Sequence, residues 1–107
     1  LVSHLYEEGL VEAIAIPQTE CFAAAIEFAR TEGIVPAPEP THAIAAAIRE
    51  ALACKESGEE KVILTALCGH GHLDLTSYDQ YLSGQMVDYE LSEEEIAEAM
   101  KTVPVMS

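Results

Sequence analysis

The sequence predicts an α/β fold in which helices alternate with strands of a parallel sheet. Residues 10–16 alternate apolar and small side chains up to Pro17, and residues 61–67 form a nearly continuous apolar run. Helical patterns lie before, between and after these two segments, an order typical of a parallel sheet with right-handed crossovers. Two strands are too few for an independent sheet. We therefore expect the chain to hide another strand, to pair with a second copy or to have lost its neighbours.

The first two helices are bounded by glycine and proline. Residues 1–8 have the pattern of a helix end, and Gly9 follows as a stop signal. A second helix opens at Pro17 and runs to about residue 31, after which Gly33 is well placed to adopt a positive φ. One face of this helix carries an apolar stripe: Phe22, Ala25, Ile26 and Ala29.

Residues 34–40 contain three prolines and predict an extended loop without regular helix. Thr41 is then the expected cap of a helix that continues to about Glu56, where Ser57 and Gly58 end it. The side chains expected to face inward on this helix are Ile44, Ile48, Ala51 and Leu52.

Two further helices begin at capping residues. Asp74 is the expected cap of a helix over residues 75–82, which follows a turn at residues 68–72. Ser92 and Glu95 have the spacing of a capping box for a last helix, which begins at Glu93 and runs to about Lys101.

The composition excludes several classes of partner. The chain has 107 residues, enough for one domain, and a net charge of −14 with only five Lys and Arg. This charge argues against nucleic acid and against an anionic membrane surface. Its apolar runs fall far short of the ~20 residues of a membrane span. The acidic clusters predict a solvated surface, with an acidic docking surface as the alternative.

Cysteine usage predicts a reducing cytoplasm with free thiols. The three cysteines form no paired motif, their number is odd and no secretory signal precedes them. The chain begins at Leu1 without Met, inside a helix pattern that is already under way, so we expect a fragment or a processed product.

The turn at residues 68–72 is a candidate site because it follows the apolar strand and precedes a helix. Ligands of open α/β sheets bind at the carboxyl ends of strands. Gly69 and Gly71 would let the backbone approach a flat ligand closely. The alternative is a tight turn that binds nothing. His70, His72 and Asp74, with Cys68, could also bind a metal, but one seven-residue loop would have to supply all four ligands.

A second candidate is Glu39, which lies between Pro38 and Pro40. A carboxylate on a stiff loop suits the orientation of a ligand, and the alternative is an exposed loop acid. We expect His42 to form local hydrogen bonds, and Cys21, like Cys54, to be an inert buried thiol. No convincing nucleophile and base can be assembled from the sequence.

The run from Pro17 to Leu82 resembles the C-terminal region of tryptophan synthase β chains, most closely the second, archaeal-type branch. The matching pieces are Arg30 to Ala37, Glu39, His42-Ala43, Leu67 to Leu75, Tyr78-Asp79 and Tyr81-Leu82. This resemblance implies that residues 1–107 are an incomplete part of a three-layer, parallel-sheet domain of fold-type II pyridoxal phosphate enzymes. It also implies an activity for the parent enzyme, the condensation of indole with L-serine to L-tryptophan.

The resemblance implies that Glu39 lies against the ring of pyridoxal phosphate, near its hydroxyl. Cys68 falls where the family usually has a Ser that hydrogen-bonds the pyridine nitrogen, and a thiol is a weaker donor. Gly69 and Gly71 would let the backbone pass beside the ring. His70 replaces an Arg of the commoner branch.

The family's Schiff-base Lys and its Gly-rich phosphate loop lie upstream of the matching region. The lysines of this chain, which are Lys55, Lys61 and Lys101, do not fit a buried imine-forming position. We therefore expect this chain alone to have no catalytic residue, not to hold the cofactor and to be inactive. Its expected partners are the upstream segment of the enzyme, further copies in a homo-oligomer and a tryptophan synthase α subunit. Two other functions stay open: an acidic binding or assembly module, and a small metal-binding domain that uses the His-rich turn.

Overall fold

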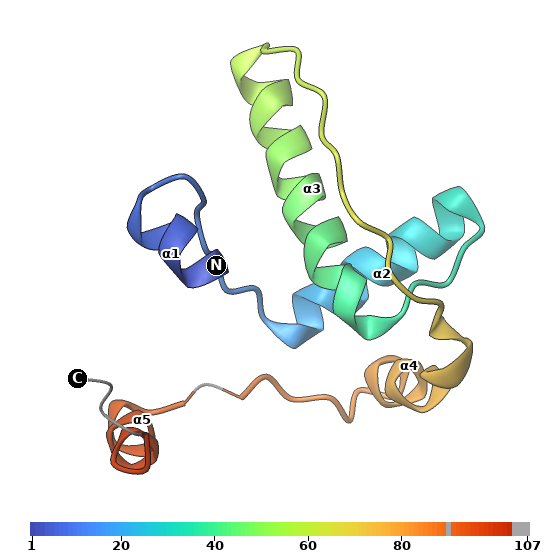
Figure 1. The fold of residues 1–107 in the computed structure, drawn as a ribbon. Helices are drawn as coiled ribbons and strands as arrows, with labels where there is room; N and C mark the ends of the chain where they lie inside the picture. The colour runs from blue at the N-terminus through green and yellow to red at the C-terminus, as the bar shows by residue number, and fades with distance from the viewer. Residues whose placement is uncertain (90, 104–107) are drawn as a thin grey trace.

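A computed structural model describes residues 1–89 and 91–103 of the chain. The elements in chain order are helices α1 (Val2–Glu7), α2 (Gln18–Glu32) and α3 (Pro38–Ser57), a 3-10 turn η1 (Gly71–Leu73), and helices α4 (Leu75–Leu82) and α5 (Glu93–Met100). Helix α2 contacts both α3 and α4, whereas α1 and α5 stand away from this group (Figure 1). The centre of the molecule is therefore α2.

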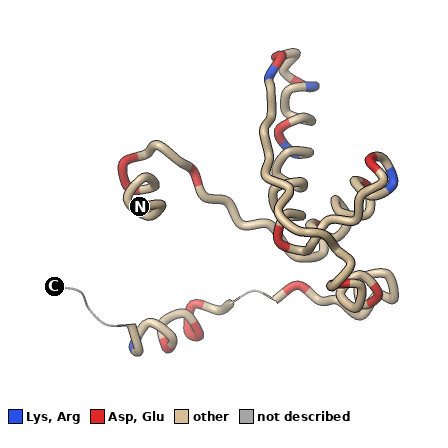
Figure 2. Tube along the Cα trace, turned by 45° about the vertical axis from the view of Figure 1, so that its right-hand side comes forward, with Lys and Arg blue, Asp and Glu red and all other residues tan. Residues whose placement is uncertain are grey.

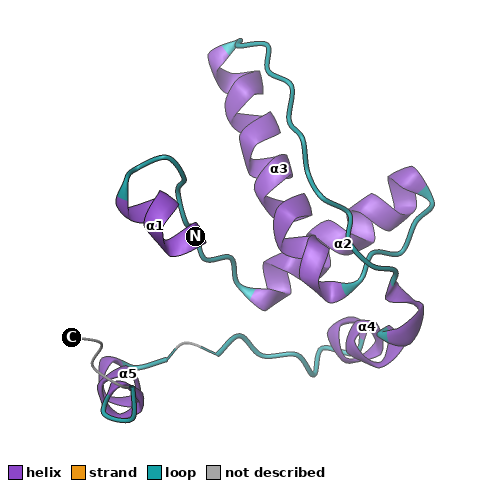
Figure 3. Cartoon of the chain, viewed as in Figure 1, coloured by secondary structure: helices purple, strands orange, loops and turns teal. Residues whose placement is uncertain are grey.

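The predicted α/β fold with a parallel sheet is wrong. Over the described ranges the chain is helix and loop without a strand (Figure 3), and residues 10–16 and 61–67 run as extended segments. A strand needs a neighbouring extended segment to receive its backbone hydrogen bonds, and neither segment has one in the described part. On one face of the apolar run, Val62 and Leu64 are 99% and 95% exposed, whereas Ile63 on the other face is 39% exposed and lies opposite α3.

Helix α2 forms where the sequence predicts it. Pro17 precedes its first turn, and Gly33 ends it in the left-handed conformation with φ 71°. On the predicted apolar stripe, Phe22 and Ala25 are buried, while Ile26 is half-buried. The stripe lies against α4, where the ring of Phe22 meets the ring of Tyr78 edge-on at 5.0 Å.

Helix α3 begins four residues earlier than predicted. Ala37 is its N-cap, and Pro38 and Pro40 lie inside its first turn. Proline is tolerated there because the first amides of a helix have no acceptor within the helix. Thr41 is thus not a cap. It is fully buried, and its hydroxyl donates to the carbonyl oxygen of Pro38. Glu39 therefore sits in a helical first turn and not on an extended loop.

Two small cores hold the helices together, and α2 contributes to both. Phe22, Ala25 and Tyr78 form the first, with Ile26, Val35, Tyr81 and Met86 packed around them. The second consists of Ala24, Ile44 and Ala45, with Ile16 and Phe28 beside them. An exposed bidentate ion pair between Arg49 and Glu20 also joins α3 to α2, with Nε–Oε1 at 2.6 Å and Nη2–Oε2 at 2.5 Å.

The second half of α3 is less covered than the sequence predicts. Ile44 is buried as expected, but Ile48 is 37% exposed and Leu52 is 56% exposed, and Ala51 is also exposed. Their face looks toward residues 61–67, which do not pack tightly on it. The prediction that all four positions face a core is therefore wrong for three of them.

The last two helices confirm their predicted starts. Helix α4 begins after Asp74, and α5 begins after Ser92 with the predicted capping box to Glu95. Helix α5 ends at Met100, next to the predicted end near Lys101. Figure 2 shows acidic residues along most of the trace, with few basic ones. No helix in the described part is both long and apolar enough to cross a membrane.

Candidate functional site

The two loops that the sequence singles out lie side by side. Pro36 and His70 form an isolated antiparallel bridge. The amide of Gly71 donates to the carbonyl of Val35 at 2.8 Å, and the amide of Ala37 donates to the carbonyl of Gly69 at 3.4 Å. We call residues 35–37 and 69–71 the paired loops. Their backbone contacts fix the start of α3 next to the turn that leads into α4.

The glycines of the second loop are required by the first loop. A Cβ at Gly71 would lie 2.6 Å from Cγ1 of Val35 and 2.7 Å from the carbonyl oxygen of Pro36. Gly69 has φ +101°, and its Cβ would lie 3.0 Å from the Cβ of Ala37. The sequence suggested that these glycines admit a flat ligand. In the structure, the side of each glycine that would carry a Cβ faces the other loop, so loop-to-loop contact is enough to explain both residues.

Tyr78 of α4 holds the first of the paired loops through a buried hydrogen bond. Its hydroxyl donates to the carbonyl oxygen of Pro36 at 2.6 Å, and the side chain is buried. Burial, and to a smaller extent the charge of Asp74, raises the pKa of Tyr78, so the phenol stays a hydrogen-bond donor. Reasoning from the sequence did not assign Tyr78 a role beyond the resemblance. Its position on the face of α4 that meets the Phe22 stripe was the available signal.

The predicted site residues surround this bridge. Glu39 is exposed in the first turn of α3, two residues beyond the paired loop. Cys68 is an exposed free thiol one residue before the other loop. The ring of His70 stacks on the ring of His72 with centroids 4.0 Å apart, and His70 Nδ1 accepts from the His72 amide at 3.2 Å. Whether Glu39, Cys68, Gly69, His70 and Gly71 contact a cofactor stays a prediction.

An exposed carboxylate and an exposed thiol flank the paired loops, and both can contact polar atoms of a ring. The lysines lie at the surface, where Lys61 pairs with Glu59 at 3.3 Å and Lys101 pairs with Glu98. Among the described residues, no group of three or more His, Cys, Asp or Glu is arranged to hold a metal ion. The metal-binding alternative gains no support.

A second cluster joins the first turn of α2 to α3. The Sγ atom of Cys21 lies 3.2 Å from Nδ1 of His42, and Cys21 is 1% exposed. Burial raises the pKa of the Cys21 thiol, which keeps it protonated and unreactive. The predictions of an inert buried Cys21 and a locally hydrogen-bonded His42 agree with this arrangement. Cys54 differs, because it is only half-buried.

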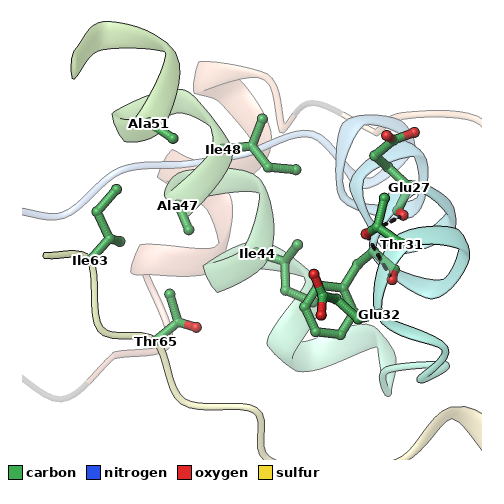
Figure 4. A pocket seen from close by; sticks show the side chains of 10 residues that line it. Glu27, Thr31, Glu32, Ile44, Ala47, Ile48, Ala51, Ile63 and Thr65 are labelled. Carbon is green, nitrogen blue, oxygen red and sulfur yellow. Dashed lines mark hydrogen bonds between the residues drawn. The ribbon is translucent and has the colours of Figure 1, made fainter. Parts of the chain in front are cut away.

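Two cavities open elsewhere on the surface. One of about 350 Å³ lies between α2, α3 and the extended segment (Figure 4). Its lining includes Ile44 and Ile48 of α3, Thr31 of α2, and Ile63 with Thr65. The other, of about 550 Å³, adjoins the Cys21–His42 cluster. Both are lined by parts of the chain other than the paired loops.

These features define a helical segment that presents polar side chains around two paired loops. The chain is 64% identical to tryptophan synthase beta chain 2 of Aquifex aeolicus (strain VF5) over 88 residues, which are 82% of this chain and 20% of that protein. It is 60% identical to tryptophan synthase beta chain 2 of Methanosarcina acetivorans over 87 residues, 81% of this chain and 20% of the relative. It is 54% identical to the tryptophan synthase beta chain of Thermococcus onnurineus over 92 residues, 86% of this chain and 21% of the relative.

The predicted resemblance to a C-terminal segment of tryptophan synthase β chains, of the second branch, is thereby confirmed. No family model matches the chain. The chain spans about one fifth of the length of these relatives.

Proposed function

We propose that this chain is the C-terminal part of a pyridoxal phosphate-dependent tryptophan synthase β chain, a lyase of tryptophan biosynthesis. The complete enzyme would condense indole with L-serine to give L-tryptophan. The observation that carries the proposal is the 64% identity to a tryptophan synthase beta chain over 88 residues. Because the chain spans about a fifth of that relative, the activity would belong to the complete protein.

In this proposal, the residues around the paired loops contact the edge of the cofactor ring. Pyridoxal phosphate, when bound, supplies an electron sink for chemistry at the amino acid substrate. Glu39 would face the ring near its hydroxyl, and the Cys68 thiol would face the pyridine nitrogen. A neutral thiol leaves that nitrogen largely unprotonated, which moderates the electron sink. Gly69, His70 and Gly71 would pass beside the ring.

The rigidity of the paired loops supports this role. Two backbone hydrogen bonds and the Tyr78 hydroxyl hold the loops together, so the residues that flank them start from fixed backbone positions. Preorganised contacts of this kind lower the cost of orienting a bound ring. The surface position of Lys55, Lys61 and Lys101 supports a segment that contacts the cofactor without forming a covalent bond to it.

The proposed partners follow from the same reading. The first is the upstream segment of the same enzyme, which would supply the Schiff-base Lys and the phosphate loop. The others are a second copy of the enzyme in a homo-oligomer and a tryptophan synthase α subunit. The three free thiols support a reducing cytoplasm as the location.

A chimeric enzyme tests the proposal. This chain would replace the matching segment of the Aquifex aeolicus enzyme, and tryptophan formation from indole and serine would be measured together with the visible absorption of bound pyridoxal phosphate. We expect an active chimera with bound cofactor. Glu39→Gln in the chimera should alter the absorption and lower kcat, because the side chain faces the ring. Glu56→Gln, an exposed acid at the far end of α3, is the matched control. A folded chimera that binds no cofactor would contradict the proposal.

A further inference from the structure

The N-terminus of α2 is capped by a residue from the far end of the chain. Pro17, the residue before the helix, has no side-chain oxygen to accept from the first turn. Asp88 takes this role. Its Oδ1 accepts from the amide of Thr19 at 2.8 Å, and its Oδ2 accepts from the Thr19 hydroxyl at 2.5 Å. A carboxylate that receives such amides is the usual stabiliser of a helix start, but here it comes from 69 residues away.

Asp88 belongs to a strap, residues 83–89, that runs from the end of α4 along α2 (Figure 1). At its beginning, the amide of Gln85 donates to the carbonyl of Gln80 at 2.9 Å. In its middle, Met86 packs against the core cluster around Phe22. At its end, Asp88 holds Thr19. The strap is therefore fixed at three points. At the last of them, the side chain of Asp88 forms two hydrogen bonds to Thr19.

The strap closes over the first turn of α2. The 550 Å³ cavity at this place is lined by Ile16, Pro17, Gln18 and His42 on one side and by Asp88 and Tyr89 on the other, with Ala15 at its edge. Cys21 belongs to the same turn, because its amide donates to the carbonyl of Pro17 at 3.1 Å. The buried Cys21 thus depends on the turn that Asp88 caps.

We propose that Asp88 is a latch, and that its release opens the first turn of α2 and exposes the buried Cys21 thiol beside His42. A helix end that loses its cap frays, and local fraying exposes side chains without global unfolding. Cys21 and His42 touch across α2 and α3, so a frayed turn admits solvent to the thiol while its histidine neighbour stays beside it. Once solvent reaches the thiol, it can lose its proton, and the thiolate can displace iodide from a probe such as iodoacetamide. The latch thereby controls the reactivity of a buried cysteine.

Site-resolved alkylation of the whole chain tests the latch, because the chain carries its own references. Iodoacetamide reacts when a thiolate sulfur displaces iodide, and mass spectrometry then reports the labelling rate of each cysteine. Cys68 is exposed, Cys54 is half-buried and Cys21 is buried. We expect fast labelling of Cys68 and slow labelling of Cys21. Asp88→Asn should raise the Cys21 rate by roughly 3- to 30-fold and leave Cys54 and Cys68 unchanged.

Asp79→Asn is the matched control, because it removes the same charge from an exposed position on α4. It should leave all three rates unchanged. Thr19→Val removes one of the two latch contacts and should raise the Cys21 rate by a smaller factor, which keeps the test open if Asp88→Asn does not fold. An unchanged Cys21 rate in both latch variants overturns the proposal. A parallel rise at all three cysteines also overturns it, because it would show global unfolding.

Discussion

Two apolar regions of this molecule differ in how far they are buried from solvent. The stripe of α2 is buried against α4, and Phe22 is 1% exposed. The segment over residues 61–67 is just as apolar, yet Val62 is 99% exposed. A helix satisfies its own backbone hydrogen bonds and needs a partner only for its side chains. An extended segment needs a partner for both. The described chain covers the helix face, whereas it gives residues 61–67 no backbone partner and covers Ile63 only in part.

The contrast continues within a single helix. The first turns of α3 bury Ile44 and Ala45 against α2, whereas Leu52, two turns further on, is 56% exposed. Both halves have the same apolar spacing in the sequence. The apolar pattern therefore predicts which face of a helix can be buried, and the neighbouring elements decide how much of that face is covered.

The largest expected effect separates the two regions directly. Phe22→Ala should lower the free energy of unfolding by about 3–5 kcal/mol, because the ring fills the core between α2 and α4. Val62→Ala should change it by less than about 0.5 kcal/mol. Urea denaturation followed by circular dichroism measures both. A loss from Val62→Ala as large as that from Phe22→Ala would show that residues 61–67 are packed after all.

Gly71→Ala should separate the paired loops. The new methyl group would meet Val35 and the Pro36 carbonyl, and overpacking of this kind costs about 1–3 kcal/mol. The amide at position 71, which donates to Val35, should also exchange faster with solvent. Gly84→Ala is the comparison, because Gly84 has φ +74° and no atom within 4 Å of its added Cβ. It should cost about 1–2 kcal/mol from backbone strain alone and leave the amide at position 71 protected.

Tyr78→Phe should cost about 1–3 kcal/mol, because it leaves the Pro36 carbonyl without its buried donor. Tyr81→Phe removes a hydroxyl from a half-buried ring that stacks on the same Phe22 and serves as control. Denaturation of the two variants side by side is the measurement. Equal losses would mean that the hydroxyl of Tyr78 does not hold the paired loops.

The smallest expected effect is a loss of stability at acid pH, which comes from two exposed carboxylates at the start of α2 and in the strap. Hydrogen bonds from Arg49 and from Thr19 hold the pKa of Glu20 and of Asp88, respectively, below their usual values. A folded-state pKa below the unfolded value contributes stability above the unfolded value, and this contribution disappears as the pH falls through the folded pKa. The usual values are 4.5 and 3.8, so the loss should begin below about pH 4.5.

Thermal melts between neutral and acid pH measure this effect. Glu20→Gln should give a flatter dependence of Tm on pH than the unmodified chain. Glu27→Gln, which removes a charge from an exposed position on the same helix, is the control. A dependence that Glu20→Gln leaves unchanged would mean that the ion pair with Arg49 does not contribute.

The elements that could be predicted from the sequence are those with local signals. Gly33 and Gly58 end α2 and α3 in the left-handed conformation, and Ser92 with Glu95 starts α5. Each signal acts within a few residues of its position. The start of α3 was misplaced because a residue well suited to capping, Thr41, outweighed the tolerance of a first helical turn for proline.

The fold class and part of the site could not be predicted, because they depend on contacts between distant residues. The apolar pattern of residues 61–67 indicates a strand but does not say what would pair with it. In the same way, the glycines and prolines predict the two loops of the candidate site. Only the structure shows that Pro36 of one loop bridges to His70 of the other. The structural role of Tyr78 depends on a distant contact in the same way, since its partner is 42 residues away.

The distance between Thr19 and Asp88 has a consequence for biosynthesis. A ribosome releases the chain from its N-terminus, and segments can fold as they emerge. Helices α2 and α3 can pair once Ser57 is free, but the contact that completes the first turn of α2 waits until residue 88 has been added. During that interval, Cys21 lies in an incomplete turn of the nascent chain. The burial of this thiol is therefore completed late, after most of the segment has been synthesised.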